Sequence, residues 1–415
     1  MQLSDIFREV VSITEQDYSG CEDRKLVAFQ PFLDMVIKLE RKNTLSSLLF
    51  SKIVNTYLHQ FLDPHMYFTY RSNSEETMDV GFGVRRYGDR LYVTQTIEET
   101  PLSKGDSIVS IDGKSIEVIS REHHLPVAHT ERQNWNYLIQ RAKSIELEDN
   151  RVLEIVEYPS KQNEDSFVVK VLEDDLVYMN LPHFQNPSLI INILQKYKDV
   201  LERSTRLIID VRKNNGGLSA AFNPLLDFIF PSSEKPKSIA KAKEFNCTER
   251  NAALFNELYR NVKESYPNHE SLPLLTYANE MFQTNKGFTE FDFSPYTKEV
   301  TTDFNSNDQI EKIVVLSDCY CASAGDDFVE MCKQSSKVTV MGRATLGVND
   351  YSDLVTMKWN KDFSLHYPTS RLVRKTEVHP IHGTGIVPDI YIPWTPEHIS
   401  RDVDLEMAIE LILKK

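Results

Sequence analysis

The chain has 415 residues, which is long enough for two or three domains, each with its own hydrophobic core. Its hydrophobic content of 41% and charged content of 26% are those of an ordinary soluble protein. The formal net charge of −14, without any basic run, argues against a protein that binds nucleic acid. No apolar stretch approaches the roughly 20 residues that a membrane-spanning helix needs.

The N-terminal stretch MQLSDIFREVVSITEQ carries acidic residues early and has no apolar core, so it indicates an amphipathic helix rather than a signal peptide. Five widely scattered cysteines, an odd number, do not make a disulfide framework. The sequence has no P-loop and no metal-ligand motif. We therefore expect a cytoplasmic protein with reduced thiols and with neither a metal nor an organic cofactor.

Residues 1–75 are expected to form an N-terminal helical domain. The third helical pattern, from Leu45 to Leu62, ends at Asp63-Pro64-His65. Proline at position 64 disfavours the α-conformation at Asp63, so His65 should lie on the loop just beyond the helix. A histidine there is either an ordinary turn residue or a base that points at a reaction centre.

Residues 76–119 contain short strands separated by turn residues, which would make a small β module. This stretch resembles a PDZ domain at nine positions, which are Gly81, Phe82, Gly83, Gly105, Asp106, Ile108, Ile111, Asp112 and Gly113. The resemblance implies that residues Gly81, Phe82, Gly83 and Val84 grip a peptide C-terminus by adding it as an extra strand. The segment 100–103 is shorter than the family's helix-bearing segment, which indicates a degenerate groove. The alternative is a β module without a binding function.

Residues 120–173 look like a connector to a main domain at 174–395, and the last stretch, 396–415, contains an amphipathic helix. In the main domain strands alternate with helices, which is typical of a layered α/β architecture. The segment from about 232 to 300 interrupts this alternation. It is expected to be either an insertion over the active face, acting as a lid or substrate wall, or a plain helical excursion.

Two strand-to-helix connections of the main domain carry candidate chemistry. Gly216 and Gly217 follow the strand at 206–211 and allow a close backbone approach, so they form either a tight connection or a backbone N–H aimed at an oxyanion. Ser323 follows a buried apolar strand and precedes a helix, whose first N–H groups are unpaired. Ser323 either caps this helix or attacks a carbonyl carbon, with the Ala324 N–H helping to hold the oxyanion.

Four landmarks, in this order, resemble the C-terminal processing (tail-specific) serine proteases and the related tricorn core protease. They are the PDZ-like module, Asp-x-Arg-x-Asn-x-Gly-Gly at 210–217, the serine turn with Gly-Arg-x-Thr-x-Gly at 342–347, and Gly-Ile-x-Pro-Asp at 385–389. The resemblance implies a layered crotonase-like α/β protease core with a helical N-terminal domain and an inserted PDZ-like module. It also implies a serine-type peptidase, a hydrolase. Relatives are often exported, whereas the N-terminal stretch here favours the cytoplasm.

The family's typical member has a lysine about two dozen residues after the serine, but no lysine occurs from Val338 to Met357. A serine hydroxyl needs a base to take its proton. In the tricorn-like branch that base is a histidine on a loop of an N-terminal helical region, and the nucleophile lies in Ser-x-Gly-Asp, which residues 323–326 match. The resemblance therefore implies Ser323 as nucleophile and His65 as general base. The implied oxyanion-hole donors are Gly216 or Gly217, together with Ala324.

The residue that orients the base is left open by the sequence. Where the tricorn protease has a glutamate, three residues before the glycine of the closing motif, this chain has His382. The nearby carboxylates that could take this role are Asp350, Asp353 and Glu377. His382 is also a rival base, and His379 is a weaker one.

The sequence thus predicts a serine peptidase that cleaves peptide bonds through an acyl-enzyme and recognises a peptide or protein substrate, with the PDZ-like module binding the substrate's C-terminus. We expect no nucleic-acid partner, no membrane span and no cofactor. Two alternatives stay open. One is a catalytically inactive relative that binds peptides, and the other is a small-ligand-binding scaffold on the same fold.

Overall fold

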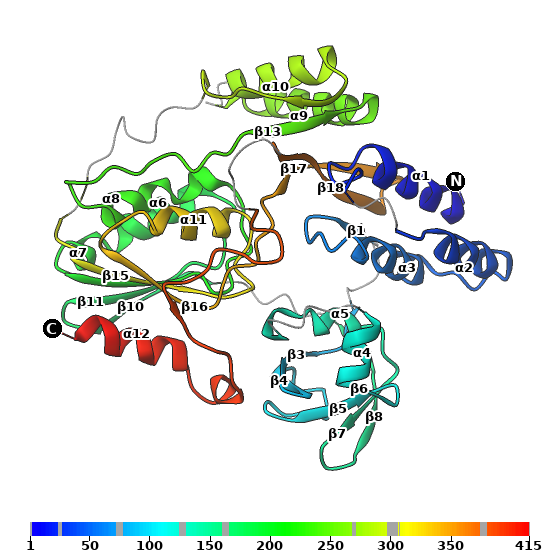
Figure 1. Cartoon of the computed structure of the whole chain (residues 1–415), viewed down its shortest axis with the longest axis horizontal. Helices are drawn as coiled ribbons and strands as arrows, with labels where there is room; N and C mark the ends of the chain where they lie inside the picture. Colours follow the sequence, from blue (N-terminus) through cyan, green and yellow to red (C-terminus); the bar gives the residue numbers. More distant parts are fainter. Residues whose placement is uncertain are drawn as a thin grey trace. The chain divides into compact units, whose positions relative to one another are not determined.

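The computed structural model describes residues 2–23, 27–71, 78–123, 130–159, 166–267, 271–296, 306, 308–373 and 380–414. Its contacts divide the chain into two compact units, each built from three segments (Figure 1). Unit 1 comprises Met1–Glu75, Ser238–Asp303 and Val348–Gly383, and unit 2 comprises Glu76–Lys237, Phe304–Gly347 and Thr384–Lys415. The stretch 174–395, expected as one main domain, therefore contributes to both units.

Unit 1 combines helices with an antiparallel sheet whose strand order is β1-β18-β13-β14, with β17 paired to β18. Its elements are α1 (Leu3–Gln16), α2 (Gln30–Arg41), α3 (Ser47–His59), β1 (Tyr67–Tyr70), β13 (Lys243–Cys247), α9 (Glu249–Ser265), α10 (Leu272–Thr284), β14 (Gly287–Glu290), β17 (Tyr351–Trp359) and β18 (Phe363–Leu372). The three N-terminal helices expected from the sequence are present.

The core of unit 1 joins residues that are far apart in the sequence. Apolar side chains recur at helical spacing along α1 and α3, and they pack against aromatic side chains of β17 and β18. The buried members include Phe7, Val10, Phe50, Trp359 and Phe363. The N-terminal helices therefore share one core with strands that lie some 300 residues later, rather than forming a core of their own.

The predicted insertion at 232–300 supplies α9, α10, β13 and β14 to unit 1. The aromatic residues Phe282 and Phe291 are buried with Phe245 in a small core of their own. The burial of these rings stabilises the insertion.

Unit 2 contains two sheets that matter for the site. Its elements up to residue 173 are β2 (Met78–Asp79), β3 (Phe82–Tyr87), β4 (Arg90–Thr96), β5 (Ser107–Ile111), β6 (Lys114–Ser115), α4 (Ile116–Glu122), η1 (Thr130–Arg132), α5 (Trp135–Ile139), β7 (Ser144–Leu147), β8 (Val152–Glu154), β9 (Tyr158–Pro159) and β10 (Val168–Glu173). The later elements are β11 (Leu176–Asn180), α6 (Pro187–Lys196), α7 (Lys198–Leu201), β12 (Arg206–Asp210), η2 (Ser219–Leu225), α8 (Leu226–Ile229), β15 (Lys312–Ser317), α11 (Ala324–Cys332), β16 (Val338–Gly342), β19 (Ile390–Tyr391), η3 (Pro396–Ile399) and α12 (Val403–Leu413).

The first sheet of unit 2 has the strand order β3-β4-β5-β7-β8. Strand β7 pairs with β5, so the sheet continues into residues 144–154. A boundary at residue 119 would cut through this sheet, and the predicted connector 120–173 supplies two of its strands. Between β6 and β7 the connector also supplies the short helices η1 and α5.

The second sheet has the order β10-β11-β12-β15-β16-β19, in which all neighbours except β10 and β11 are parallel. Figure 1 shows α12 on one face of this sheet and α6, α8 and α11 on the other. A parallel sheet that is covered on both faces needs continuous apolar strands, which explains the buried run from Ile313 to Leu316 in β15. The carboxyl ends of its parallel strands meet at one edge.

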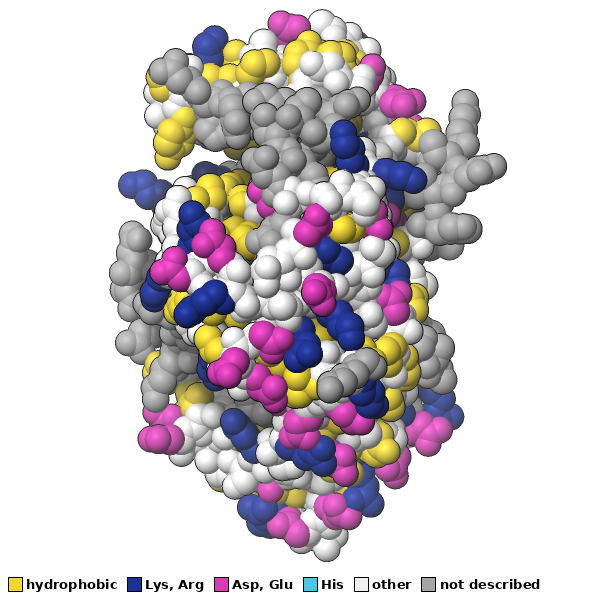
Figure 2. Space-filling view, turned by 90° about the vertical axis from the view of Figure 1, so that its left-hand side faces the viewer, with side chains coloured by type: hydrophobic (Ala, Val, Ile, Leu, Met, Phe, Trp, Pro, Cys, Tyr) yellow, Lys and Arg dark blue, Asp and Glu magenta, His cyan; other side chains and the backbone are white. Residues whose placement is uncertain are grey.

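No helix among the described residues has the length and apolar character that a membrane span requires. On the face that Figure 2 shows, acidic and basic side chains are interspersed rather than separated into patches of one sign. Within the described ranges, no group of three or more histidine, cysteine or acidic side chains is placed to hold a metal ion.

Charged side chains form a buried network at the carboxyl edge of the parallel sheet. Asp318, directly after β15, receives bidentate hydrogen bonds from Arg85 of β3 at 2.7 and 2.8 Å, and lies 2.8 Å from Arg343. Arg343 also donates to Asp404 of α12, at 2.8 Å. Burial alone would raise the pKa of the Asp318 and Asp404 carboxyls. Arg85 and Arg343 at Asp318, and the hydrogen bonds from His398 and Arg343 at Asp404, outweigh it and hold both pKa values well below the ordinary range. The network ties the first sheet, the β15 turn and α12 together.

This network predicts a steep loss of stability in acid. A carboxyl whose pKa is lower in the folded state stabilises the fold fully above the pKa of the unfolded chain, about 3.9 for aspartate. Its contribution is lost as the pH falls further toward the folded-state pKa, because the unfolded chain then binds more protons. We expect the free energy of unfolding, measured by urea titration from pH 6 to 3, to fall with pH.

The matched variant is Asp404→Asn. It leaves a buried guanidinium less well paired, so it should be less stable at pH 7 by about 3–5 kcal/mol. Its stability should also fall less between pH 6 and pH 3, because one low-pKa carboxyl is gone. If the free energy of unfolding of the variant depends on pH as strongly as that of the wild type between pH 6 and pH 3, Asp404 does not titrate as described.

Candidate active site

Ser323 lies where β15 passes into α11, at the N-cap of the helix, as the sequence predicts. Its backbone has φ +58° and ψ −118°, whereas Ser46 and Ser115, which cap α3 and α4, have φ −76° and −66°. A left-handed φ at a residue other than glycine costs on the order of 1–3 kcal/mol, and such strain concentrates at active sites. Ser323 does occupy a capping position, but an ordinary cap does not need this conformation. The strain therefore favours the nucleophile over the plain cap.

The strained turn is held by hydrogen bonds from two other loops at the carboxyl edge. The buried carboxylate of Asp326 accepts the N–H of Ser323 at 2.8 Å and that of Gly347 at 2.9 Å. The carbonyl oxygen of Asn214 accepts the N–H of Ala322 at 2.9 Å. The loops after β12, β15 and β16 are thereby fixed to one another around Ser323.

We expect Asp326→Asn to lower kcat/KM by about 10- to 100-fold, the effect of losing one hydrogen bond to an ionised group. The amide accepts on one side only, and its NH₂ group would face a backbone N–H. Peptide hydrolysis and thermal unfolding measured together check this. The control is Asp327→Asn. The carboxylate of Asp327 is adjacent in sequence and accepts the Ser219 hydroxyl at 2.7 Å, so this variant should keep activity near that of the wild type. Equal losses in the two variants would argue against the described role of Asp326.

The glycine pair lies against Ser323. A Cβ atom on Gly216 (φ +88°) would come within 2.7 Å of the Ser323 Cβ and 2.8 Å of the Ala322 carbonyl oxygen. The Gly216 N–H, however, donates to the buried Oδ1 of Asn214 at 2.9 Å. This corrects the assignment of Gly216 as an oxyanion-hole donor, because its N–H is already engaged.

Two other predicted donors keep their N–H groups unengaged by the described residues. These are Gly217 and Ala324, and Ala324 is the first residue of α11. A Cβ on Gly217 (φ +139°) would lie 2.3 Å from the carbonyl carbon of Phe184, so position 217, in the loop after β12, must be glycine for the chain to pass. Gly217 and Ala324 therefore remain the candidate oxyanion-hole pair.

His65 lies in unit 1, on the loop beyond α3, as Pro64 predicts. The loop is held by Asp63, whose buried carboxylate accepts the His65 N–H at 2.9 Å. The ring nitrogen Nδ1 of His65 is 2.7 Å from the carbonyl oxygen of Tyr351. Among the described residues no partner is found for Nε2, which leaves that nitrogen for proton transfer.

The predicted orienting carboxylates are engaged elsewhere within unit 1. Asp350 accepts the backbone N–H groups of Ile381 and His382, at 3.1 and 2.8 Å. Asp353 accepts from Ser370 and from Lys243. The His382 ring stacks edge-on against Tyr351, with ring centroids 5.8 Å apart. Glu377 and His379 lie outside the described residues.

The predicted peptide-binding strand is β3, an edge strand of the first sheet. Its outer edge is occupied: α5 contacts β3, and the side chain of Asn136 accepts the Val84 N–H at 2.7 Å. The Gly81 N–H donates to Asp79 at 3.1 Å, and Phe82, Gly83 and Val84 are buried. Residues 81–84 thus do not offer the open edge that strand addition needs, which corrects this prediction.

Comparison with known proteins decides the family. The sequence model described as Peptidase family S41 matches residues 175–392. The chain belongs to peptidase family S41. Membership confirms the resemblance inferred from the four landmarks, and it places the chain among serine peptidases.

Solved structures with this fold include mature CPAF, with 13% sequence identity, a TM-score of 0.62 and coverage of 99% of this chain and 96% of that one. Mature CPAF complexed with lactacystin has 12% sequence identity and a TM-score of 0.61, and the match covers 99% of this chain and 97% of that one. The photosystem II D1 C-terminal processing protease has 15% sequence identity and a TM-score of 0.44, and the match covers 100% of this chain and 98% of that one. No curated protein sequence matches the chain. At these identities the CPAF structures show the mixed α/β fold that this S41 peptidase shares.

Three features of the site are not predicted by the sequence. Asn214 is a position of the Asp-x-Arg-x-Asn-x-Gly-Gly motif, and the sequence does not show that its side chain accepts the Gly216 N–H and its carbonyl oxygen the Ala322 N–H. Asp326 is part of the Ser-x-Gly-Asp match, and the sequence does not predict its bonds to the backbone of Ser323 and Gly347. The available signal was an acidic residue in the first turn of a helix, where a negative charge is favourable. Arg132 of η1 donates to the carbonyls of residues 344, 345 and 346, at 2.7 to 2.9 Å, and no local pattern marks it.

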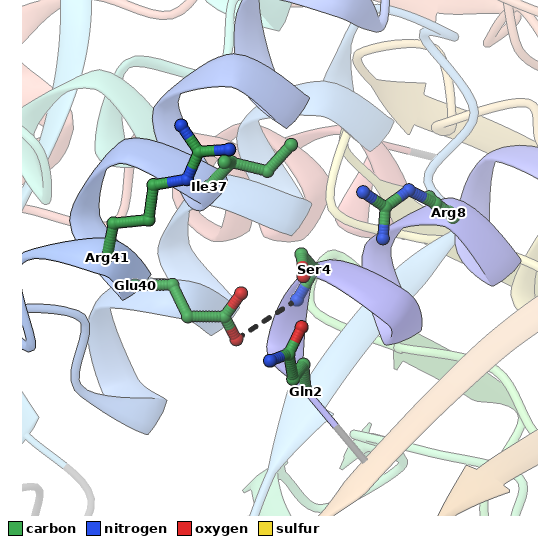
Figure 3. A pocket seen from close by; sticks show the side chains of 6 residues that line it. All are labelled: Gln2, Ser4, Arg8, Ile37, Glu40 and Arg41. Atoms are coloured by element: carbon green, nitrogen blue, oxygen red, sulfur yellow. Dashed lines mark hydrogen bonds between the residues drawn. The ribbon is translucent and has the colours of Figure 1, made fainter.

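A pocket of 270 Å³ lies between α1 and α2 of this S41 peptidase, and none of the predicted catalytic residues lines it (Figure 3). Its lining residues are Gln2, Ser4, Arg8, Ile37, Glu40 and Arg41. Glu40 accepts the N–H groups of Leu3 and Ser4 at 2.8 and 3.4 Å. Its carboxylate is the negative charge that stabilises the N-terminus of α1. The Glu40 carboxylate at the pocket therefore contributes to capping α1.

Proposed function

We propose that this chain cleaves peptide bonds through an acyl-enzyme, with Ser323 as the nucleophile and His65 as the general base. The observation that carries the proposal is the strained backbone of Ser323 at the start of α11, beside the glycine pair. The proposal places the chain in the tricorn-like branch, because no lysine occurs from Val338 to Met357. It also retains a layered crotonase-like core and a PDZ-like first sheet.

In the proposed reaction, Nε2 of His65 takes the proton of the Ser323 hydroxyl while Oγ attacks the carbonyl carbon of the substrate. The negative charge moves to the substrate oxygen, which accepts hydrogen bonds from the N–H groups of Gly217 and Ala324. The tetrahedral intermediate collapses, the C–N bond breaks, and His65 gives its proton to the leaving amine. A water molecule, deprotonated by His65, then hydrolyses the ester on Ser323 by the same steps.

The nucleophile and the oxyanion donors come from unit 2, whereas the base comes from unit 1. The proposal therefore needs one chemical group from each unit. A substrate C-terminus would still be recognised near the first sheet, but at a surface other than the covered edge of β3. Protein or peptide substrates follow from the family, and their sequence preference is a matter for experiment.

The test is covalent labelling with a serine-reactive fluorophosphonate, located by peptide mass spectrometry. The proposal expects one modified residue, Ser323, and no labelling of Ser323→Ala. Because mature CPAF forms a complex with lactacystin, pre-incubation with lactacystin is a second probe, expected to slow the labelling.

Labelling at another residue would refute Ser323 as the nucleophile. Absence of labelling together with intact binding of peptides would favour the inactive, peptide-binding relative. Absence of both would favour the small-ligand scaffold.

A further inference from the structure

The His65 ring is held by a main-chain carbonyl group and not by a carboxylate. We propose that the carbonyl oxygen of Tyr351 takes the place of the third, acidic member of a serine–histidine triad in this enzyme. The inference rests on the proposed function, because it concerns the orientation of the proposed base. Tyr351 is then a positioning residue that acts through His65.

The contact fixes the tautomer of the ring. A carbonyl oxygen only accepts hydrogen bonds, so the Nδ1 atom at 2.7 Å must carry the proton and donate it. Neutral imidazole has a single N–H, and Nε2 therefore has the lone pair that removes a proton from a hydroxyl. This is the task that a buried aspartate performs in an ordinary triad, where the wrong tautomer lowers kcat by about 10⁴-fold.

The acceptor is rigid on its own side. Tyr351 begins β17 and pairs with Arg371 of β18, and the Tyr351 hydroxyl donates to Asp23 at 2.8 Å. Its neighbour Asp350 accepts the Leu372 N–H through the main-chain oxygen at 3.1 Å. The carbonyl of Tyr351 is thus part of a sheet edge anchored on both sides, which suits a positioning group.

His65 is fixed on the opposite side by Asp63. One oxygen of this carboxylate accepts the His65 N–H at 2.9 Å, and the other accepts the Tyr18 hydroxyl at 2.7 Å. Tyr18 is fully buried, and its ring lies against that of Tyr351 with centroids 5.9 Å apart. Tyr18 therefore touches both the loop that carries the base and the residue that supplies the acceptor.

The described carboxylates near the ring are not available for this role. Both oxygens of Asp350 hold the backbone at residues 381 and 382, and Asp63 holds backbone and hydroxyl groups rather than the ring. The chain has no aspartate or glutamate at the position of the tricorn glutamate, where His382 stands. A carbonyl dipole can orient an imidazole without a full negative charge, so a carboxylate partner is not required.

The decisive experiment is a long-range ¹H–¹⁵N correlation spectrum of the full chain labelled with [¹⁵N]histidine, recorded at pH 8.5, with His65 assigned from His65→Gln. The proposal expects a protonated Nδ1 and an unprotonated Nε2 in the wild type and in Ser323→Ala. A proton on Nε2 would overturn it, whether or not the enzyme is active. If the spectrum agrees but the fluorophosphonate labels nothing, the proposed function fails while the ring geometry stands.

Kinetics supplies the second readout. Tyr18→Phe removes the hydroxyl that steadies Asp63, and we expect a kcat roughly tenfold lower, an unchanged KM and a mixture of tautomers at His65. Tyr367→Phe is the matched control, because Tyr367 is also a fully buried tyrosine of unit 1 whose hydroxyl donates to a side chain, that of Asn251 at 2.8 Å. Equal effects of the two variants on kcat and on the tautomer would refute a role in positioning.

Discussion

Ser323→Ala is expected to abolish peptide hydrolysis, with kcat lowered by about 10⁴-fold or more. The substitution removes the atom that would form the acyl bond, and the oxyanion donors alone give only weak catalysis. The strained φ of +58° stays in the variant, so its free energy of unfolding should fall only by the loss of the N-cap hydroxyl, about 0.5–2 kcal/mol. Steady-state hydrolysis of a peptide library, together with thermal unfolding, measures both effects.

Ser219→Ala provides the comparison for that result. Ser219 opens η2, close in sequence to the glycine pair, and its hydroxyl donates to Asp327 at 2.7 Å. This variant removes a serine hydroxyl from the same unit without touching the proposed nucleophile, so activity should stay near that of the wild type. Hydrolysis that survives in Ser323→Ala but disappears in Ser219→Ala would point to a different active serine.

Gly217→Ala should cause the second largest loss. The added Cβ would meet backbone atoms of Phe184 at 2.3 and 2.4 Å, and φ +139° is strained for alanine, so the loop after β12 must move. We expect a loss of about 2–5 kcal/mol in the free energy of unfolding. We also expect kcat to fall by about 10²–10³-fold, because the Gly217 N–H would leave the oxyanion position.

The control for the glycine is Gly113→Ala. Gly113 also has a left-handed φ, +74°, but no atom lies within 4 Å of its added Cβ. It should lose about 1–2 kcal/mol of stability from the backbone alone and keep its kcat. If Gly217→Ala behaves like Gly113→Ala in both measurements, the close contact with Phe184 and the oxyanion role of Gly217 are wrong.

Local signals in the sequence were enough for the second sheet and for the strand-to-helix turn at Ser323. The β-branched run before Ser323 predicts a strand buried on both faces, and the structure gives β15. Proline at position 64 predicts the end of the third helix and the loop position of His65, and α3 ends at His59. Such features depend on neighbouring residues, which is why they can be read without the fold.

The features that escaped prediction are contacts between distant segments. The bond from His65 to the carbonyl of Tyr351 joins residues 286 positions apart and involves a main-chain atom, so no side-chain pattern encodes it. The use of the Gly216 N–H by Asn214 and of the Val84 N–H by Asn136 depends on side-chain directions that spacing does not reveal. The interleaving of 238–303 and 348–383 with the N-terminal helices is likewise a result of shared burial.

The most direct test of the central claim is the second-order rate at which a fluorophosphonate labels Ser323 in the wild type, in His65→Ala and in His382→Ala. If His65 deprotonates the Ser323 hydroxyl, the rate in His65→Ala should fall by about 10²–10⁴-fold, while His382→Ala should label at nearly the wild-type rate. Labelling of His65→Ala at the wild-type rate would contradict the account, and a loss confined to His382→Ala would assign the base to that residue instead.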